Sequence, residues 1–164
     1  ILETAKTIAV LEGVGDHENV GAIFRHAAGM GVDAVLLGSG AAGPRYRRSV
    51  RVSMGHVLRL PFAHLEGGFT TWQRSLQALA DASFTLISLT PNPHAVHLAE
   101  AMHGLDKVAM LVGAEGPGLT EHAMKATDIR ARIPMAPCTD SLNVATAAAI
   151  SFYERQRSLS DLNV

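Results

Sequence analysis

The sequence predicts a single α/β domain built on a parallel, Rossmann-like β-sheet. Short apolar runs alternate with amphipathic segments along the whole chain, which is the pattern of strands followed by covering helices. Most of these runs are continuous rather than alternating, as expected for strands buried on both faces. With 48% apolar residues and no internal repeat or polar linker, we expect residues 1–164 to form one domain with its own core.

The predicted strands are short and end at turn-forming residues. The first covers residues 7–11 and is followed by Glu12 and Gly13. Similar runs predict further strands at residues 34–37, 58–61, 84–89, 107–112 and 129–133.

The predicted helices show apolar residues at helical spacing. In the first, Asn19 is a candidate N-cap and Gly31 follows the last turn. Its apolar positions are Val20, Ile23, Phe24, Ala27 and Met30. Other helices are expected at residues 69–80, 119–125 and 142–156.

Ligands of open α/β sheets bind beyond the carboxyl ends of the strands. Three polar or glycine-rich loops follow predicted strands, at residues 12–19, 113–119 and 134–143. We therefore expect functional residues in these loops.

The loop at 113–119 contains Gly113, Gly116 and Gly118, which allow a ligand to approach the backbone closely. It matches neither a phosphate-binding P-loop nor the dinucleotide fingerprint. A tight connection explains the glycines equally well, although Glu115 offers a carboxylate for a hydroxyl or cationic group of a ligand.

The loop at 134–143 is stiffened by two prolines and leads Ser141 and Asn143 to the start of the last helix. Helix capping by Asp140 or Ser141 is an alternative explanation for its polar residues. Cys138 is expected to be a small packing residue, because no histidine lies close in sequence to act as a base.

The arginines of the sequence are also candidate functional residues. Arg25 is expected on the polar side of the first helix, where it either contacts an RNA phosphate or serves as a solubilising charge. Residues 34–65 contain no Asp or Glu, so their arginines create a positive field that suits a polyphosphate partner, although a solvated face is also possible. These arginines are Arg45, Arg47, Arg48, Arg51 and Arg59.

Several classes of protein are disfavoured. Every apolar run ends before about 18 residues, too short for a membrane span. The first ten residues do not resemble a signal peptide, and one cysteine allows no internal disulfide, so we expect a cytoplasmic protein. His94, His97 and His103 with Glu100 do not have the spacing of zinc ligands, so no metal is expected and an exposed polar helix explains them.

Taken in order, the segments resemble the SpoU/TrmH family of the SPOUT methyltransferases. The resemblance covers about residues 8–154 and is specific through the order of its motifs. Ala114 and His26 depart from the residues common in the family. The motifs are 18–25 (ENVGAIFR), 50–55 (VRVSMG), 60–62 (LPF), 111–119 (LVGAEGPGL), 133–135 (IPM) and 141–145 (SLNVA).

The resemblance implies a C-terminal deep trefoil knot, a homodimer, and methyl transfer from S-adenosylmethionine to a ribose 2′-hydroxyl of rRNA or tRNA. Catalytic roles are implied for Asn19, Arg25, Glu115, Ser141 and Asn143. Arg45, Arg47, Arg48 and Arg51 are expected to bind RNA. The implied cofactor-binding residues are Leu89, Gly113, Glu115, Gly118, Ile133, Met135, Ser141, Leu142 and Ala145.

The resemblance assigns Arg25 as the base, but a guanidinium has a pKa far above neutral pH and stays protonated, so binding of phosphate or of a developing alkoxide is the simpler role. Many members also carry an N-terminal substrate-binding domain that these residues lack, so the chain is expected to be part of a longer protein. Two alternatives stay open: a catalytically silent SPOUT-like module that binds RNA or S-adenosylmethionine, and an unrelated flavodoxin-like enzyme.

Overall fold

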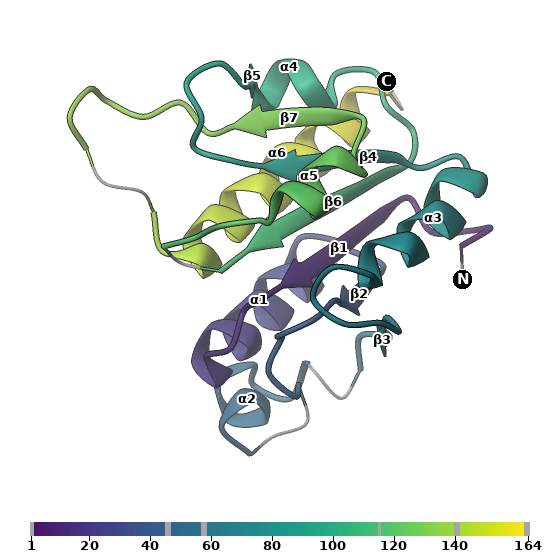
Figure 1. The fold of residues 1–164 in the computed structure, drawn as a ribbon, viewed down its shortest axis with the longest axis vertical. Coiled ribbons are helices and arrows are strands. Elements are labelled where there is room, and N and C mark those ends of the chain that lie inside the picture. Colours follow the sequence, from purple (N-terminus) through teal and green to yellow (C-terminus); the bar gives the residue numbers. More distant parts are fainter. Residues whose placement is uncertain (1, 45–46, 57–58, 115, 140–141, 163–164) are drawn as a thin grey trace.

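A computed structural model describes residues 2–44, 47–56, 59–114, 116–139 and 142–162. The predicted α/β fold with a parallel sheet is confirmed: seven strands pair in the order β3-β2-β1-β6-β4-β7-β5, and each pairing is parallel (Figure 1). The strands are β1 Thr7–Glu12, β2 Ala34–Leu37, β3 Phe62–His64, β4 Thr85–Leu89, β5 Val96–His97, β6 Val108–Gly113 and β7 Ile129–Arg132.

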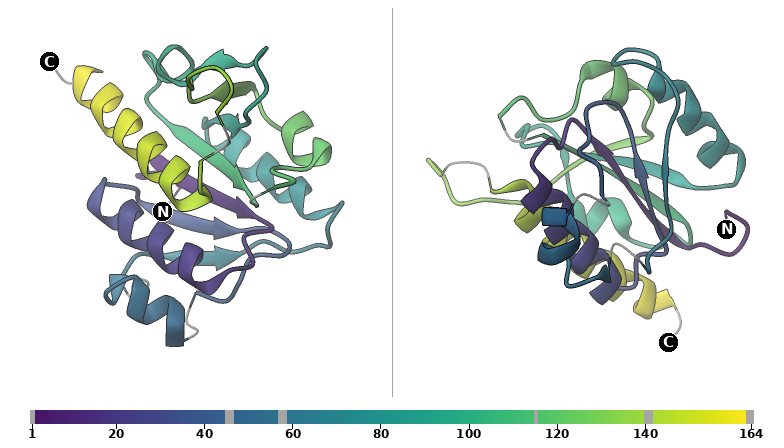
Figure 2. Two further views of the ribbon diagram at one scale, coloured as in Figure 1. Left: turned by 90° about the vertical axis from the view of Figure 1, so that its left-hand side faces the viewer. Right: turned by 90° about the horizontal axis from the view of Figure 1, so that it is seen from below.

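Helices cover both faces of the sheet (Figure 2). On one face α1 (His17–Gly29), α4 (Leu98–Met102) and α6 (Val144–Leu162) share an apolar cluster with the strands. On the other face, the 3₁₀ helix η2 (Trp72–Leu76), α3 (Gln77–Asp81) and α5 (Glu121–Lys125) complete a second cluster. A further short helix, α2 (Arg47–Val52), packs against α1.

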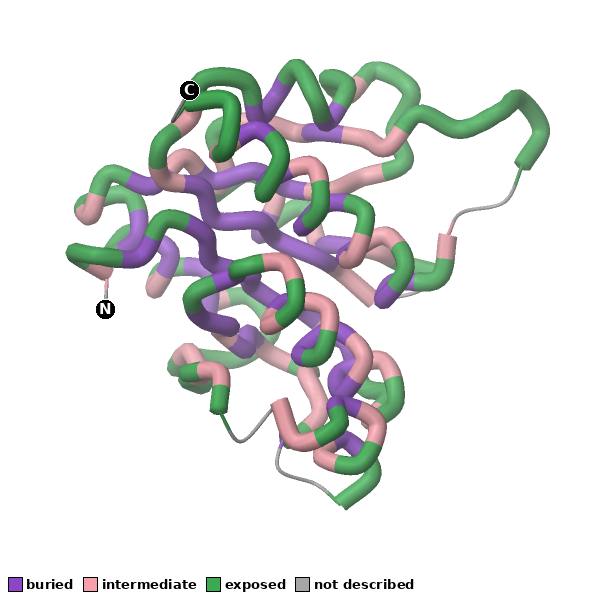
Figure 3. The backbone as a smooth tube through the Cα atoms, turned by 180° about the vertical axis from the view of Figure 1, so that it is seen from behind, coloured by how far each residue is buried: buried purple, intermediate pink, exposed green. Residues whose placement is uncertain are grey.

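The strand β1 supplies side chains to both clusters. Ala9 and Leu11 belong to the first cluster, whereas Ile8 and Val10 belong to the second. Successive side chains of a strand point to opposite faces, so a strand buried on both sides must be apolar throughout. Figure 3 shows the consequence, since the buried backbone is concentrated in the central strands.

Two predicted elements are displaced. The prediction of a strand at 58–61 is wrong, because β3 starts only at Phe62. Arg59 and Leu60 belong to a turn instead, in which both of their backbone N–H groups donate to the carbonyl of His56. Residue 58 lies outside the described residues. The helix expected at 69–80 starts only at Trp72, after a turn in which the N–H of Gly68 donates to Thr71 Oγ1 at 2.8 Å.

The helix starts also differ from the expectation. Asp16, not Asn19, caps α1, because its carboxylate accepts the N–H groups of Glu18 and Asn19. The last helix begins at Val144, and the Oδ1 of Asn143 accepts the N–H groups of Ala145 and Thr146, at 2.9 and 3.2 Å. The proposed caps Asp140 and Ser141 lie outside the described ranges.

The segment containing His94, His97 and His103 is not an exposed polar helix. Its helix α4 buries Leu98, Ala101 and Met102, at the i, i+3 and i+4 spacing of one helical face. In the described ranges, no three His, Cys, Asp or Glu side chains converge as metal ligands. Nor does any helix there have the length and apolar character needed to cross a bilayer.

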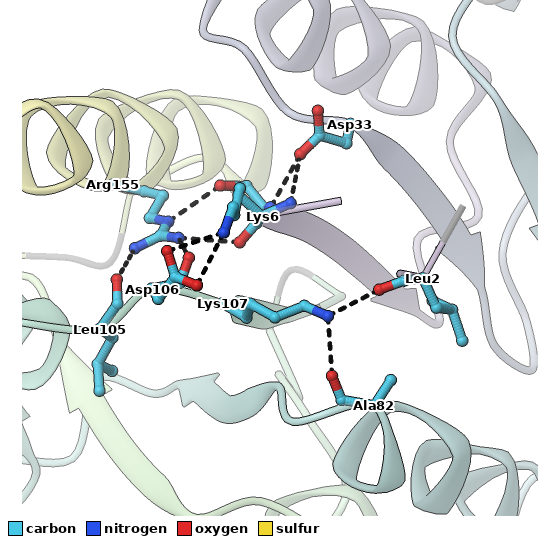
Figure 4. A network of polar contacts seen from close by, with 9 residues as sticks. Leu2, Lys6, Asp33, Ala82, Leu105, Asp106, Lys107 and Arg155 are labelled. Carbon is cyan, nitrogen blue, oxygen red and sulfur yellow. Dashed lines mark hydrogen bonds and ion pairs between the residues drawn. The ribbon is translucent and has the colours of Figure 1, made fainter. Parts of the chain in front are cut away.

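A buried arginine holds α6 at the amino edge of the sheet (Figure 4). Arg155 is 1% exposed and donates to Thr7 Oγ1 (2.9 Å) and to the carbonyls of Lys6, Leu105 and Asp106 (2.9, 2.6 and 2.6 Å). Burial lowers the pKa of its guanidinium, although Asp106 and Asp33 act in the opposite direction. Arg155 therefore fixes where the last helix lies along the sheet.

Candidate functional site

A pocket opens at the carboxyl edge of the sheet, where β4, β6 and β7 end and α6 begins. The loops after these strands and the first turn of α6 line it, and most of the lining atoms are apolar. Its lining residues are Leu89, Thr90, Pro91, Val112, Gly113, Ala114, Gly116, Gly118, Ile133, Met135, Leu142, Val144 and Ala147.

Six of the residues expected to bind a cofactor lie in this lining: Leu89, Gly113, Gly118, Ile133, Met135 and Leu142. Ala145 does not line the pocket and packs in the apolar cluster, whereas Val144 and Ala147 line the pocket from α6. Glu115 and Ser141 fall outside the described residues. Thr90 and Pro91 were missed, although their position directly after the buried strand β4 could have indicated them.

The glycine loop is held in a tight turn against the end of β6. The N–H of Gly118 donates to the carbonyl of Ala114 at 2.9 Å, and Gly116 and Gly118 have φ angles of +81° and +68°. A Cβ on Gly113 would lie 2.3 Å from the backbone nitrogen of Leu119. Glycine at 113 is therefore required by close packing of the backbone, and the loop presents peptide groups to the pocket.

One hydrogen bond joins the first and third predicted loops. Asn143 Nδ2 donates to Asn19 Oδ1 at 3.2 Å, across 124 positions of sequence. Since Asn143 Oδ1 already caps α6, its amide can offer only the nitrogen to Asn19. Asp16 caps α1, which leaves the side chain of Asn19 available for this contact.

Arg25 lies on the solvent-exposed side of α1, whereas its neighbours Ile23 and Phe24 are fully buried. It does not belong to the pocket lining. Burial lowers the pKa of the adjacent His26, and the charge of Arg25 lowers it further. Arg25 thus presents its guanidinium to solvent beside a histidine whose charged form is disfavoured.

The arginine segment forms the exposed face of α2. Arg48 pairs with Glu18 of α1, with its Nε 3.0 Å from the carboxylate, and this contact raises the pKa of Arg48. The two helices touch closely, because a Cβ on Gly21 would lie 2.6 Å from the carbonyl oxygen of Ser49. Arg48 therefore attaches α2 to α1, whereas Arg47 and Arg51 are directed to solvent. Arg45 lies outside the described residues.

Comparison with known proteins agrees with this geometry. A protein named as an uncharacterised tRNA/rRNA methyltransferase of Mycobacterium tuberculosis is 54% identical over 160 residues, covering 96% of this chain and 54% of the relative. A 23S rRNA (guanosine-2′-O-)-methyltransferase of Xylella fastidiosa is 33% identical over 154 residues, covering 93% of this chain and 59% of the relative. The chain thus spans little more than half the length of these curated relatives.

Solved structures give the same result for the fold. The crystal structure of an AdoMet-bound rRNA methyltransferase from Sinorhizobium meliloti matches with a TM-score of 0.83 and 27% identity, over 94% of this chain and 57% of that one. An RNA 2′-O ribose methyltransferase matches with a TM-score of 0.80 and 30% identity, over 94% and 57% of the two chains. The family model described as "SpoU rRNA Methylase family" matches residues 6–153, and the chain therefore belongs to that family.

Proposed function

We propose that this domain transfers a methyl group from S-adenosylmethionine to the 2′-hydroxyl of a ribose in rRNA or tRNA. The observation that carries the proposal is the hydrogen bond between Asn19 and Asn143, which joins the family motifs at 18–25 and 141–145 beside the pocket lined by Gly113, Ile133 and Leu142. The names of the relatives, which include a 23S rRNA guanosine 2′-O-methyltransferase, support the reaction class.

The pocket suits S-adenosylmethionine. Its apolar walls from Leu89, Ile133 and Leu142 fit a purine ring, and the peptide groups around Gly113 and Gly118 can bind polar edges. Glu115 and Ser141 complete the set that we assign to the cofactor. When bound, the cofactor supplies a methyl group on a sulfonium, and no metal is needed for that transfer.

The protein's contribution is to orient the ribose and to stabilise its 2′-oxygen while the proton of the hydroxyl passes to water. Asn19 and Asn143 hold each other in fixed orientations and can direct the sugar. A guanidinium is a poor proton acceptor but a good hydrogen-bond donor, so we assign Arg25 to the adjacent phosphate and to the developing alkoxide rather than to proton removal. Binding in the correct geometry can itself supply up to roughly 7–11 kcal/mol of the barrier.

We also propose that the end of the chain forms a trefoil knot. The strand β7 lies between β4 and β5, which an earlier segment, residues 90–95, already connects. The chain therefore leaves β7 at Ile133 beside that segment, which a knot requires it to cross before α6. A crystal structure in which the chain after β7 runs outside residues 90–95 would contradict the knot.

We also propose that two copies of the chain form a homodimer. Ile150 and Tyr153, one turn apart on α6, are 39% and 55% exposed, and their apolar surface suits burial against another copy. Light scattering at micromolar concentration should give the molar mass of two chains, and Tyr153→Glu should shift it toward one. A wild-type mass of one chain would contradict the proposal.

The cofactor proposal is tested by filling the pocket from α6. Ala147→Leu should weaken binding of S-adenosylhomocysteine by about tenfold or more, because the larger side chain occupies the lining at Ala147. Calorimetric titration measures this, with Thr146→Leu as the matched control on the exposed side of the same turn. No binding to the folded wild type would reject the proposed function. Binding without methylation of total rRNA or tRNA would support the silent module instead.

The role of Arg25 is tested by a change that keeps its charge. Arg25→Lys should lower the single-turnover methylation rate by about 10- to 100-fold, because an ammonium lacks the planar pair of donors. Arg74→Lys, also on an exposed helical arginine, is the control. Near-full turnover of Arg25→Lys would exclude bidentate binding of phosphate.

The proposal that the exposed arginines of α2 bind RNA is tested by reversing their charge. Reversing Arg47 and Arg51 to Glu should weaken RNA binding by about tenfold or more and reduce its salt dependence by the equivalent of about two phosphate contacts. Affinity for S-adenosylhomocysteine should stay unchanged. Reversal of Arg74 and Lys125, exposed cations of the opposite helical layer, makes the same change in net charge. If that control variant lost RNA affinity equally, the α2 surface would not be the binding site.

A further inference from the structure

We propose that Glu12 is a positioning residue for the cofactor pocket: its buried carboxylate holds the exit of the glycine loop, residues 113–119, in its binding geometry. The inference rests on the proposed function, since it concerns the same pocket. Glu12 itself does not line the pocket.

Glu12 occupies the point where the two central strands end together. It is the last residue of β1, and its register partner is Gly113, the last residue of β6 and the first of the glycine loop. Only 2% of Glu12 is exposed. Its pairing with Gly113 therefore places a buried carboxylate at the start of the glycine loop.

Four hydrogen bonds converge on this carboxylate. Oε1 accepts the backbone N–H of Thr120 at 2.8 Å. Oε2 accepts the Thr120 hydroxyl at 3.0 Å, the indole N–H of Trp72 at 2.7 Å and the amide of Gln73 at 3.1 Å. Glu12 thus connects β1 with the start of η2 and with the residue that follows the glycine loop.

This arrangement is costly to build. Burial of a carboxylate disfavours folding unless its hydrogen bonds compensate, and none of the ion pairs within the described ranges includes Glu12. Gln73 directs its amide to Glu12 and to the carbonyl of Phe69, and its own Oε1 is buried with no partner in the described part of the chain. An apolar residue would fill the end of β1 at lower cost, so the carboxylate requires another explanation.

The contact with Thr120 supplies that explanation. Thr120 follows Leu119 and also caps α5, because its Oγ1 accepts the N–H of Ala123 at 3.1 Å. Glu12 therefore fixes the backbone at Thr120, while the absence of a Cβ on Gly113 lets Gly118 and Leu119 pack against the end of β6. Gly113 and Gly118 are held between these two contacts and face the pocket.

The test uses Glu12→Gln, which keeps the shape of the side chain. A glutamine has only one acceptor oxygen. Its amide nitrogen would therefore face, without accepting, either the N–H of Thr120 or the three donors that bind Oε2 in the wild type. The matched control is Thr7→Val, which removes an acceptor from the buried Arg155 at the opposite end of the same strand. Both variants remove a buried hydrogen bond from β1, but only the first lies next to the glycine loop.

Binding of S-adenosylhomocysteine is measured by calorimetry at a temperature at which circular dichroism shows each variant fully folded. Glu12→Gln should weaken binding by about tenfold or more, and Thr7→Val by less than about twofold. Trp72 is the single tryptophan, so its indole N–H gives one NMR signal that reports on the Glu12 carboxylate. In the wild type this signal should shift on titration with S-adenosylhomocysteine, with the same Kd as calorimetry gives.

The outcomes separate this inference from the proposed function. If the wild type does not bind S-adenosylhomocysteine, the proposed function fails and the inference fails with it. If the wild type binds but folded Glu12→Gln binds equally well, or the Trp72 signal does not respond, Glu12 is structural only. Equal weakening by Glu12→Gln and Thr7→Val would also overturn the inference, because stability alone would then account for the loss.

Discussion

The parallel pairing of β1, β6 and β4 is the constraint on which the rest of this molecule depends. Because the three strands run in one direction, with Glu12 beside Gly113 and Ser88 beside Leu111, the loops that follow them emerge at one edge. Segments far apart in sequence meet there without a long excursion of the chain. The apolar clusters on the two faces keep these strands in register, and the polar chemistry is confined to the edge.

The sequence was most informative about the central sheet and least informative about short elements. Strands β1, β2, β4 and β6 are runs of four to six residues, and burial requires most of these residues to be apolar. The helices α2 and α4 have six and five residues, too few to show a helical period. The strand β3 was displaced because Leu60 packs against the core from a turn, and an apolar side chain does not reveal its backbone conformation.

Residues of the candidate site could be predicted from the sequence where only one residue type fits the local backbone. Gly113 is such a residue, since only glycine permits its contact with Leu119. Contacts with distant partners could not be read in the same way. Nothing local indicates that Arg48 pairs with Glu18, or that Glu12 is an acceptor and not simply the polar end of a strand. Capping by Asp16 in place of Asn19 was equally hidden, because both residue types cap helices well.

The last helix is held at both ends, by Asn143 at the carboxyl edge and by Arg155 at the amino edge. They are twelve positions apart, which corresponds to a rise of about 18 Å along the helix. Deleting or inserting one residue in this interval would rotate one end by about 100° relative to the other and break one of the two attachments. The length of this segment should therefore be invariant through evolution, even where its individual side chains are free to change.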